Sequence, residues 1–361
     1  MARPSLHIVK RRRPPDLADR FFTAVSRLED WVRQHLAFTL VIAIAVITPF
    51  LILSEQLGGR LIIASGWMTF FMAWHLGLGL TRQAQDAIER MNRRNILVGP
   101  DDALKTWLTS SVESWSRRAA WATALAMLVA FAGVSSEYWF GHPVPLTLAL
   151  SETVAGFFAG RILGQMIGVG TLGRKIKRGE WMIHPQPGHV DGAAGLKPVG
   201  DLYFREAMVL AIPALFLGAW VLVAANYPGV GWYEVYMALL VAVVGLEVSV
   251  FVLPMLSFHE IMKREKRKFL VEVDERSEKL QRLEDELPDI TDDNLRKSVA
   301  DQIARLQDRY RKVEAMPTWP IDKSIRLRFT IRNALLLLPV IGSAINALIT
   351  SMDNVRNFFG V

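Results

Sequence analysis

The chain has 361 residues, of which 51% are hydrophobic, and its 42 basic and 35 acidic side chains give a formal net charge of +7. The mean hydropathy is +0.23, which favours a membrane protein over a water-soluble one of this length. The chain contains no cysteine, so disulfides, thiolate metal sites and a thiol nucleophile are excluded.

Six apolar segments follow one another along the chain, each with charged residues at its edges and few within. About 20 apolar residues are needed to cross roughly 30 Å of hydrocarbon. The six segments are residues 37–54, 61–80, 119–135, 146–172, 207–225 and 233–258. The sequence therefore predicts an all-α polytopic membrane protein whose transmembrane domain, with six transmembrane helices, covers residues 37–258.

The distribution of lysine and arginine predicts how these spans are oriented. Basic residues concentrate in the N-terminal arm, residues 1–36, and in the loops after the second and fourth spans. The loops between them, residues 55–60, 136–145 and 226–232, share a single arginine. The positive-inside rule therefore places both termini in the cytoplasm. The excess positive charge is expected to face the anionic surface of the lipid bilayer, and nucleic acid is not an expected partner.

A charged segment, residues 259–316, follows the sixth span without a helix breaker. A stripe of mostly apolar residues steps by three and four over 269–287, with Arg276 at one of its positions, and a second stripe covers 295–313, on the other side of a polar turn at 288–293. This pattern predicts a cytoplasmic antiparallel helical hairpin of coiled-coil type that continues the sixth span. The hairpin is either a solvated spacer or a stalk for a protein partner or for oligomerisation.

The last segment, residues 317–361, is expected to return to the membrane. Its apolar run, residues 335–349, is shorter than a span and is interrupted by Pro339 and Gly342. A re-entrant or interfacial segment is therefore predicted rather than a seventh crossing.

Two spans carry stripes of small residues at helical spacing. Such stripes let another helix backbone approach closely, although small residues are also common in membrane helices generally. We expect the stripe of the fourth span to pack against that of the sixth. The stripes are Gly156, Gly160, Gly164 and Gly168 in the fourth span, and Ala238, Ala242, Gly245 and Ser249 in the sixth.

Arg161 and Glu247 lie near the middles of the fourth and sixth spans, at matching depth. An unpaired charge there costs at least about 2.5–3.5 kcal/mol, so each needs a partner, a neutral form or water. Mutual pairing is the simplest hypothesis, although helix phase points Glu247 away from the small-residue stripe. The two residues would form either a structural ion pair or part of an ion or proton pathway, with Gln165, Glu152 and His75 as further polar candidates.

The loop after the fourth span contains His184, His189 and Asp191 among several glycines and prolines. Imidazole and carboxylate groups bind several divalent ions, but this spacing matches no established site and no metal is predicted. The alternative is an ordered turn in which Asp191 or His189 holds backbone amides. No phosphate-binding loop, Gly-x-Ser-x-Gly or His-Glu-x-x-His motif is present, so neither a cofactor nor an enzymatic activity is predicted.

Residues 188–196 read Gly-His-Val-Asp-Gly-Ala-Ala-Gly-Leu. They resemble the His-Pro-Asp-x-Ala-Gly-Gly-Leu loop of a group of uncharacterised bacterial multi-pass membrane proteins, with Val190 in place of the proline and Ala194 in place of the second glycine. Proteins of that group also have a proline and then a histidine where a span ends, as do Pro254 and His259 here, and a Trp-Pro pair after the stalk, as at 319–320. The resemblance covers the second half of the chain. It implies a bacterial inner-membrane location and no particular activity.

These features together favour a homo-oligomeric ion-conducting pore or gated channel. Its small-residue stripes would pack or line an axis, and its stalk would relay a cytoplasmic signal into the bundle. The alternative is a membrane scaffold or sensor whose stalk binds a protein partner. A small-solute transporter and a membrane enzyme are lesser alternatives, because the chain shows neither an internal repeat nor a catalytic constellation.

Overall fold

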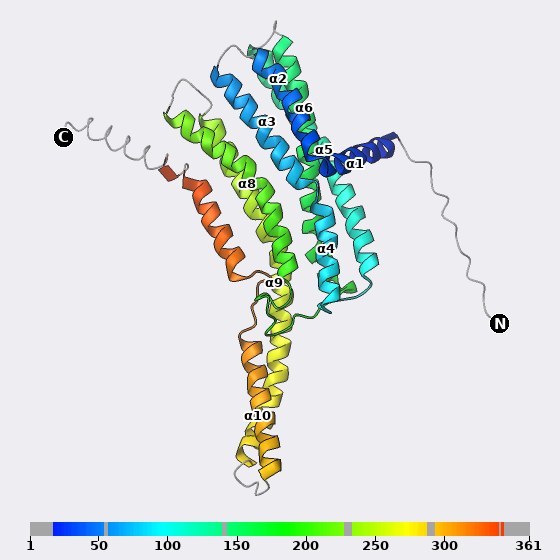
Figure 1. The fold of residues 1–361 in the computed structure, drawn as a ribbon, viewed down its shortest axis with the longest axis vertical. Coiled ribbons are helices and arrows are strands. Elements are labelled where there is room, and N and C mark those ends of the chain that lie inside the picture. The colour runs from blue at the N-terminus through cyan, green and yellow to red at the C-terminus, as the bar shows by residue number, and fades with distance from the viewer. Residues whose placement is uncertain are drawn as a thin grey trace, which may run out of the picture.

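The computed structural model describes residues 17–53, 57–138, 143–226, 233–286, 293–338 and 341–342. Nearly all of them are helical, and the helices form an elongated bundle with a long arm at one end (Figure 1). In chain order the elements are α1 (Leu17–Gln34), α2 (Leu36–Leu53), α3 (Leu57–Gly77), α4 (Leu80–Arg93), β1 (Leu97–Val98), α5 (Asp101–Tyr138), α6 (Pro143–Gly170), α7 (Leu172–Lys175), η1 (Ile176–Glu180), β2 (Met182–Ile183), α8 (Lys197–Asn226), α9 (Tyr233–Glu286) and α10 (Asp293–Glu314). A further helix, residues 323–338, follows α10 and is called the C-terminal helix below.

Four helical segments are long and apolar enough to cross a membrane, which makes an integral membrane protein plausible. They are Leu61–Arg93, Ala149–Arg178, Lys197–Ala225 and Tyr233–Glu275, and α1 with α2 would add a fifth if that bent pair is one span. The predicted third span lies within α5, which is not among these segments. The count of six transmembrane helices therefore stays a prediction.

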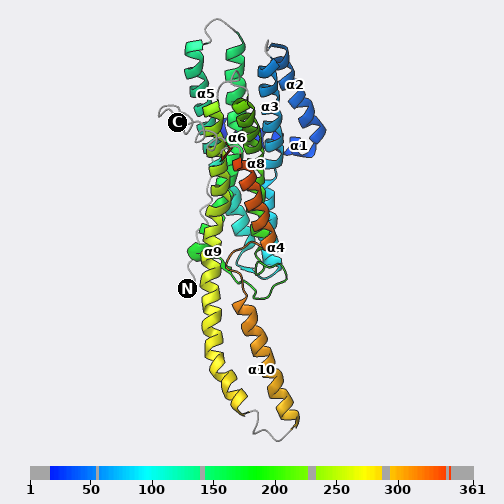
Figure 2. The ribbon, with the colours of Figure 1, turned by 90° about the vertical axis from the view of Figure 1, so that its left-hand side faces the viewer.

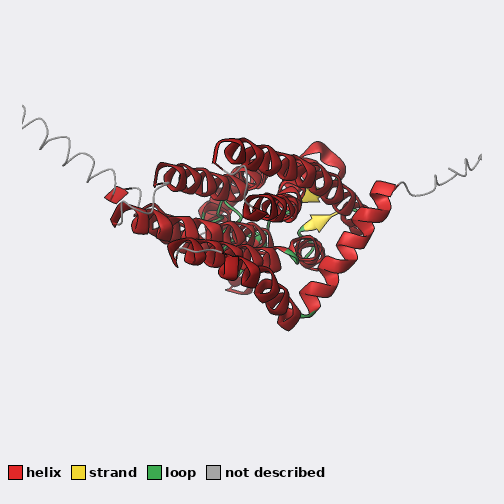
Figure 3. Ribbon diagram, turned by 90° about the horizontal axis from the view of Figure 1, so that it is seen from above, coloured by secondary structure: helices red, strands yellow, loops and turns green. Residues whose placement is uncertain are grey.

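Two pairs of neighbouring helices form the centre of the bundle. α5 packs along α6, and α8 packs along α9, while α3 lies against both α2 and α8. Seen from above, the foreshortened helices of the bundle lie side by side, with the two short strands among them (Figure 3). β1 and β2 pair antiparallel, with Leu97 opposite Ile183.

The largest buried core lies toward the arm, where helical segments that were expected to be loops close the bundle. α4 buries Leu80, Ala84, Ala87, Ile88 and Met91, a spacing typical of one face of an amphipathic helix. This face packs with the first half of α5, the end of α6, β2, and the facing parts of α8 and α9. The region between the predicted second and third spans is therefore a folded part of the bundle.

α9 is a single helix of 54 residues that contains Pro254, so the predicted sixth span and the charged segment after it form one continuous helix, as expected. Figure 2 shows it running from the bundle to the far end of the arm. The arm consists of residues 259–286 of α9 together with α10. Val273 of α9 and Val299 and Ile303 of α10 are among its buried apolar residues.

The base of the arm is closed by hydrogen bonds from Lys266, whose Nζ donates to the carbonyl oxygens of Glu314 (2.7 Å) and Met316 (2.8 Å). Residues 287–292, with most of the predicted polar turn, lie outside the described residues. The coiled-coil character of the arm and its cytoplasmic location stay predictions.

The C-terminal helix returns from the base of the arm to the bundle. Asp322 precedes it, and its Oδ1 accepts a hydrogen bond from the amide of Ile325 at 2.8 Å, as an N-cap residue does. Phe329 stacks on Phe251 of α9 with ring centroids 4.1 Å apart. The predicted re-entrant or interfacial run begins in the last turn of this helix, and its residues 339–340 and 343–349 lie outside the described residues.

The glycine stripe of α6 packs on α5, so the expected contact with the stripe of α9 is wrong. A Cβ atom at Gly168 would lie 2.6 Å from Cα of Val112, and one at Gly164 would overlap the backbone of Trp115 and Ser116. At Gly245 of α9 a Cβ would meet no atom within 4 Å. α5 directly precedes α6 in the chain and packs antiparallel along it, so α5 occupies the close-approach face of α6.

The rest of the α9 stripe is open as well. Ala238, Ala242 and Gly245 are exposed, and Ser249 is partly buried with its hydroxyl donating to the carbonyl oxygen of Gly245 at 2.7 Å. On α6, Gly156 and Gly160 face Thr123, whose hydroxyl donates to the carbonyl oxygen of Gly156 at 2.7 Å.

Candidate functional site

Arg161 of α6 is buried and pairs with Glu29 of α1. Its Nε and Nη2 donate to the two carboxylate oxygens of Glu29, both at 2.7 Å, and Nη2 also lies 3.1 Å from the hydroxyl of Ser26. The Arg161 and Glu29 side chains are 3% and 8% exposed. The planar guanidinium suits such a two-point bond. The ring of Phe22 lies 5.5 Å from the guanidinium carbon and covers one of its faces.

Glu247 of α9 forms the second buried pair, with Arg332 of the C-terminal helix. Nη2 of Arg332 donates to Oε1 of Glu247, and the amide of Asn333 lies 3.4 Å from the same oxygen. The Glu247 side chain is fully buried, whereas that of Arg332 is 16% exposed. The guanidinium carbon of Arg332 also lies over the rings of Phe204 and Phe329, at 5.3 and 5.5 Å from their centroids.

The hypothesis that Arg161 and Glu247 pair with each other is therefore wrong. Each charge receives its partner from a segment outside the predicted spans, Glu29 from the N-terminal arm and Arg332 from the C-terminal segment. The charges of the N-terminal arm were expected to face the lipid surface, and Arg332 lies just before the predicted re-entrant run, residues 335–349. Each buried charge nevertheless has a partner, as expected, since a buried unpaired ion is strongly disfavoured.

The other polar candidates do not join these pairs. Gln165 is buried one turn after Arg161, and His75 is half-buried on α3. Within the described residues, Oε1 of Gln165 and Nδ1 of His75 are buried without a hydrogen-bond partner. Glu152 is half-buried nearer the opposite end of α6.

Glu206 of α8 is a buried acid that the sequence pattern did not single out. It is completely buried, and neither of its carboxylate oxygens has a hydrogen-bond partner among the described residues. Burying an isolated carboxylate is costly, so a proton or a partner must compensate for it. The signal was hidden because Glu206 directly precedes the predicted fifth span and follows Arg205, like an ordinary charge at a span edge.

The loop with Asp191 is an ordered turn built on that carboxylate. Oδ1 of Asp191 accepts hydrogen bonds from the amides of Ala193 (3.0 Å) and Gly195 (2.9 Å). Partial burial raises the pKa of Asp191, but these amides and His189 outweigh burial and the pKa is lowered. Gly195 has a φ of +91°, and a Cβ there would overlap Ile96. The turn interpretation of Asp191 is confirmed.

The metal interpretation of the same loop finds no support in its geometry. Nδ1 of His189 lies 2.9 Å from Oδ1 of Asp191, whereas the side chain of His184 is exposed. The backbone amide of His184 extends the strand pairing by donating to the carbonyl oxygen of Ile96 at 2.8 Å. In the parts of the chain that the structure describes, no three His, Asp or Glu side chains gather as metal ligands do.

Two residues that carry the resemblance lie in contact at the base of the arm. The rings of His259 and Trp319 stack with centroids 4.4 Å apart, and Nδ1 of His259 lies 2.7 Å from the carbonyl oxygen of Thr318. Nearby, Nζ of Lys197 lies 2.8 Å from Oδ2 of Asp322. Partial burial raises the pKa of Asp322, but Lys197, the amide of Ile325 and the hydroxyl of Ser324 outweigh it and lower the pKa to about 2.

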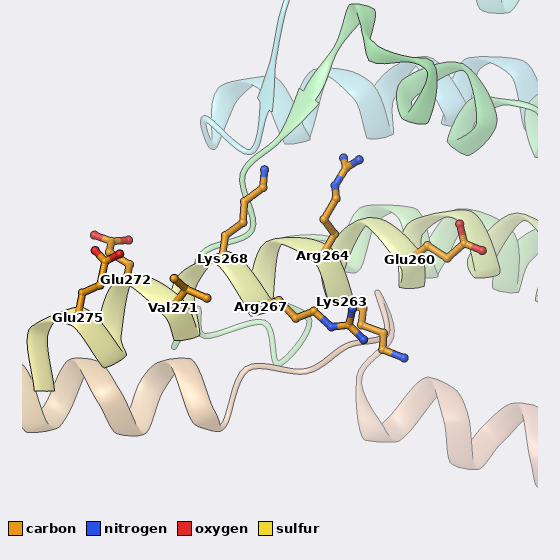
Figure 4. A pocket seen from close by; sticks show the side chains of 8 residues that line it. All are labelled: Glu260, Lys263, Arg264, Arg267, Lys268, Val271, Glu272 and Glu275. Carbon is orange, nitrogen blue, oxygen red and sulfur yellow. The ribbon is translucent and has the colours of Figure 1, made fainter.

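A basic groove lies where the arm leaves the bundle. It consists of two adjoining hollows of about 650 and 550 Å³ that share Glu260. In the larger one, Lys268 and Arg264 project to one side of α9, and Arg267 and Lys263 to the other (Figure 4). The basic side chains of the groove are Arg174, Lys177, Arg178, Lys263, Arg264, Arg267 and Lys268.

Acidic neighbours balance only part of this charge. Lys177 pairs with Glu260, and Lys268 pairs with Glu265 at 2.7 Å. Arg264 lies 3.7 Å from the same Glu265 carboxylate. Within the described residues, the four cations that form no salt bridge are all exposed, and they are Arg174, Arg178, Lys263 and Arg267. The groove is therefore a concentrated positive surface suited to an anionic partner.

Comparison of the chain with known protein families, with curated proteins and with solved structures gives no match. The class of protein that the fold defines is thus an all-helical protein with several apolar helices long enough to span a membrane.

Proposed function

We propose that the protein is a membrane-anchored scaffold or sensor that binds an acidic segment of a protein partner in the basic groove at the base of its arm. The observation that carries this proposal is the group of exposed cations without a salt bridge, Arg174, Arg178, Lys263 and Arg267, on two segments that line one groove. The membrane in question is the bacterial inner membrane, with the arm and both termini in the cytoplasm.

The position of two of these cations, Lys263 and Arg267, favours a protein partner over lipid headgroups. If α9 enters the hydrocarbon at Tyr233 or before it, about 20 residues cover roughly 30 Å, and the hydrocarbon ends at residue 253 at the latest. Lys263 then lies at least about 15 Å and Arg267 at least about 21 Å beyond that boundary, at 1.5 Å per residue. The polar layer of one leaflet is only about 5–7 Å thick, so these two cations lie in water beyond the headgroups.

The continuous α9 supplies a physical connection between the groove and the bundle. The same helix carries Lys263 and Arg267 in the groove and Glu247 in the buried pair. A partner that pulls on or shifts the arm would therefore act on the contact between α9 and the C-terminal helix. This is the coupling that a sensor requires.

The test replaces Arg178, Lys263 and Arg267 together by glutamate in the full chain in membranes. A photo-crosslinking residue at Arg264 captures the partner in cells, and a fluorescent polyglutamate peptide reports groove affinity in nanodiscs. We expect the reversed groove to lose both crosslinking and peptide binding by at least tenfold. The matched control reverses Arg296 and Lys297, two exposed cations of α10 outside the groove, and should change neither. Unchanged binding after groove reversal overturns the proposal.

A homo-oligomeric pore is the second candidate, and one observation favours it. The small-residue face of α9, Ala238, Ala242 and Gly245, is exposed in the single chain, and such faces pack closely against other membrane helices. If a second copy covers this face, Ala242→Leu will reduce the oligomer in nanodiscs, whereas Leu239→Ala on a neighbouring exposed face will not. A monomer that conducts no ions at any potential contradicts this candidate.

A further inference from the structure

α1 has three distinct faces, although its sequence was expected to form only part of a basic arm, residues 1–36. One face packs on the bundle through Phe22, Val25, Glu29 and Val32. A second face is polar and carries Arg20, Thr23, Arg27, Asp30 and Gln34. The third face is apolar and exposed, and it consists of Leu17, Phe21, Ala24, Leu28 and Trp31. Its spacing of four, three, four and three residues is that of one continuous helical stripe.

The packed face holds α1 firmly across the bundle. Glu29 forms the two-point bond with Arg161, and Phe22 stacks on Phe157 with centroids 6.0 Å apart. Asp19 pairs with Arg117 of α5. α1 is bent by 106° from the helix that follows it and lies crosswise to the bundle in Figure 1. It therefore lies along the plane in which the apolar helices would meet the membrane surface.

Several large side chains of the apolar face are exposed, and their contact with water is unfavourable. Leu17 is 83% exposed, Phe21 47% and Leu28 45%. On α5 the same surface continues through the exposed side chains of Trp121 and Leu125, and Phe21 lies 6.3 Å from the ring of Trp121. A stripe that is continuous with the exposed apolar surface of a bundle helix fits acyl chains.

We propose that α1 is an interfacial helix of the leaflet on the arm side of the membrane. Its face Leu17, Phe21, Ala24, Leu28 and Trp31 contacts acyl chains, and Arg20 and Arg27 contact the phosphates of anionic headgroups. Amphipathic helices of this kind lie with their apolar face at the boundary between headgroups and acyl chains. Arg20 and Arg27 border the apolar face on its polar side, where long basic side chains reach headgroups.

This position of α1 implies that the Arg161–Glu29 pair lies at a different depth in the membrane from the one expected for Arg161 from the sequence. From Trp121 to the end of α5 at Tyr138 the helix is about 26 Å long at 1.5 Å per residue, close to the roughly 30 Å of hydrocarbon. α6 has a similar length between its start at Pro143 and Arg161. The pair then lies at the inner boundary of the hydrocarbon and not at its middle, and headgroups and water at that boundary lower the cost of the charges.

The absence of cysteine makes the test direct, because every single-cysteine variant can carry one spin label. Labels at Phe21→Cys and Leu28→Cys report the apolar face, labels at Thr23→Cys and Asp30→Cys report the polar face, and Leu125→Cys on α5 is the hydrocarbon reference. All five positions lie in the described part of the chain. The full protein is studied in nanodiscs that contain phosphatidylglycerol and phosphatidylcholine.

We expect labels at Phe21 and Leu28 to collide with dissolved oxygen as the Leu125 label does, and labels at Thr23 and Asp30 to collide with a water-soluble nickel chelate. A Leu28 label that is open to the nickel chelate places this face in water and overturns the proposal. A Leu28 label shielded from both reagents shows that protein or a second copy covers the face, and overturns it equally.

The headgroup contact is tested by lipid composition. In nanodiscs of phosphatidylcholine alone, the Leu28 label should lie shallower than in the mixture with phosphatidylglycerol. Arg20→Gln with Arg27→Gln should abolish this difference, whereas Arg33→Gln, whose arginine pairs with Asp30, should keep it. If depth does not depend on phosphatidylglycerol, the anionic headgroup contact is wrong.

Discussion

Two groups of helices each bury a charge, but they do so in different ways. The first group is the pair α5 and α6 with α1, and the second is the pair α8 and α9 with the C-terminal helix. In each, the second helix of the pair has a buried charge that holds a helix from one end of the chain. The first group is closed, with a two-point ion pair and a glycine stripe in contact with the neighbouring helix. The second uses one carboxylate oxygen and leaves its small-residue stripe exposed.

This difference suggests different roles for the two groups. Tight packing and a two-point bond make the α5–α6 group the more rigid part. The α8–α9 group has the open face and continues into the arm, so it is the part in which a partner or a second copy could change the packing. Variants that weaken each group separately will show whether the comparison holds.

The largest effect is expected from Arg161→Leu. It leaves the Glu29 carboxylate buried without its partner, which typically costs about 3–5 kcal/mol. Thermal unfolding in detergent, followed by circular dichroism, measures the loss. The double variant Arg161→Leu with Glu29→Leu should recover most of it, because no charge then remains in the site.

Charge exchange separates the observed pairing from the pairing first expected. The loss of stability caused by Arg161→Glu should be rescued in part by adding Glu29→Arg, but not by adding Glu247→Arg. Rescue by the exchange with Glu247 would contradict the structure directly.

Arg332→Met should cost less, about 2–3 kcal/mol, because removing Arg332 leaves Glu247 with only the amide of Asn333 at 3.4 Å. Arg332 is partly exposed, so water can compensate part of the loss. Limited proteolysis should release the C-terminal helix in this variant while α1 stays protected. Equal release of both helices would show that the two groups are not independent.

One glycine from each small-residue stripe provides a matched pair of variants. Gly164→Ala inserts a methyl group into the backbone of α5 and should destabilise by about 1–3 kcal/mol. Gly245→Ala meets no atom within 4 Å and should be neutral or stabilising by up to about 1 kcal/mol, since alanine favours the helix. A destabilising Gly245→Ala would mean that a second copy already occupies the α9 stripe.

The smallest expected effect is a change of stability with pH, which arises from Asp322 at the base of the arm. The pKa of Asp322 is about 2 in the folded chain, below its ordinary value of 3.8, so its contribution to stability is complete above about pH 4. It is lost as the pH falls from about 4 towards 2. We expect about 1–2 kcal/mol, because exposure of Lys197 screens the pair. Asp322→Asn should remove this step from the unfolding profile, and an unchanged profile would refute the assignment.

Much of the architecture is local and was therefore readable in the sequence. The apolar lengths predicted helices at the right places, and the lack of a breaker after Phe258 predicted the continuous α9. The turn around Asp191 was also a local matter, because an aspartate followed by glycines makes hydrogen bonds to its own backbone. The amphipathic helix α1 was missed, although its pattern of Leu17, Phe21, Leu28 and Trp31 was available.

The candidate sites depend on contacts between distant parts of the chain, and these the sequence did not reveal. Nothing local shows that Glu29 meets Arg161, 132 positions away, or that Arg174 and Arg178 share a groove with Lys263. Glu206 lies at a predicted span edge, where a charge is ordinarily solvated, and only the packing of the bundle buries it.

The sequence by itself determined the helical, membrane-compatible character of the protein, because hydrophobic length and charge placement act residue by residue. Only the tertiary structure decided which charges pair with each other. It also decided which small-residue stripe packs against another helix and which one stays exposed. Those outcomes depend on helix neighbours and rotation, which are set by the packing of the whole bundle and by the two terminal helices that close it.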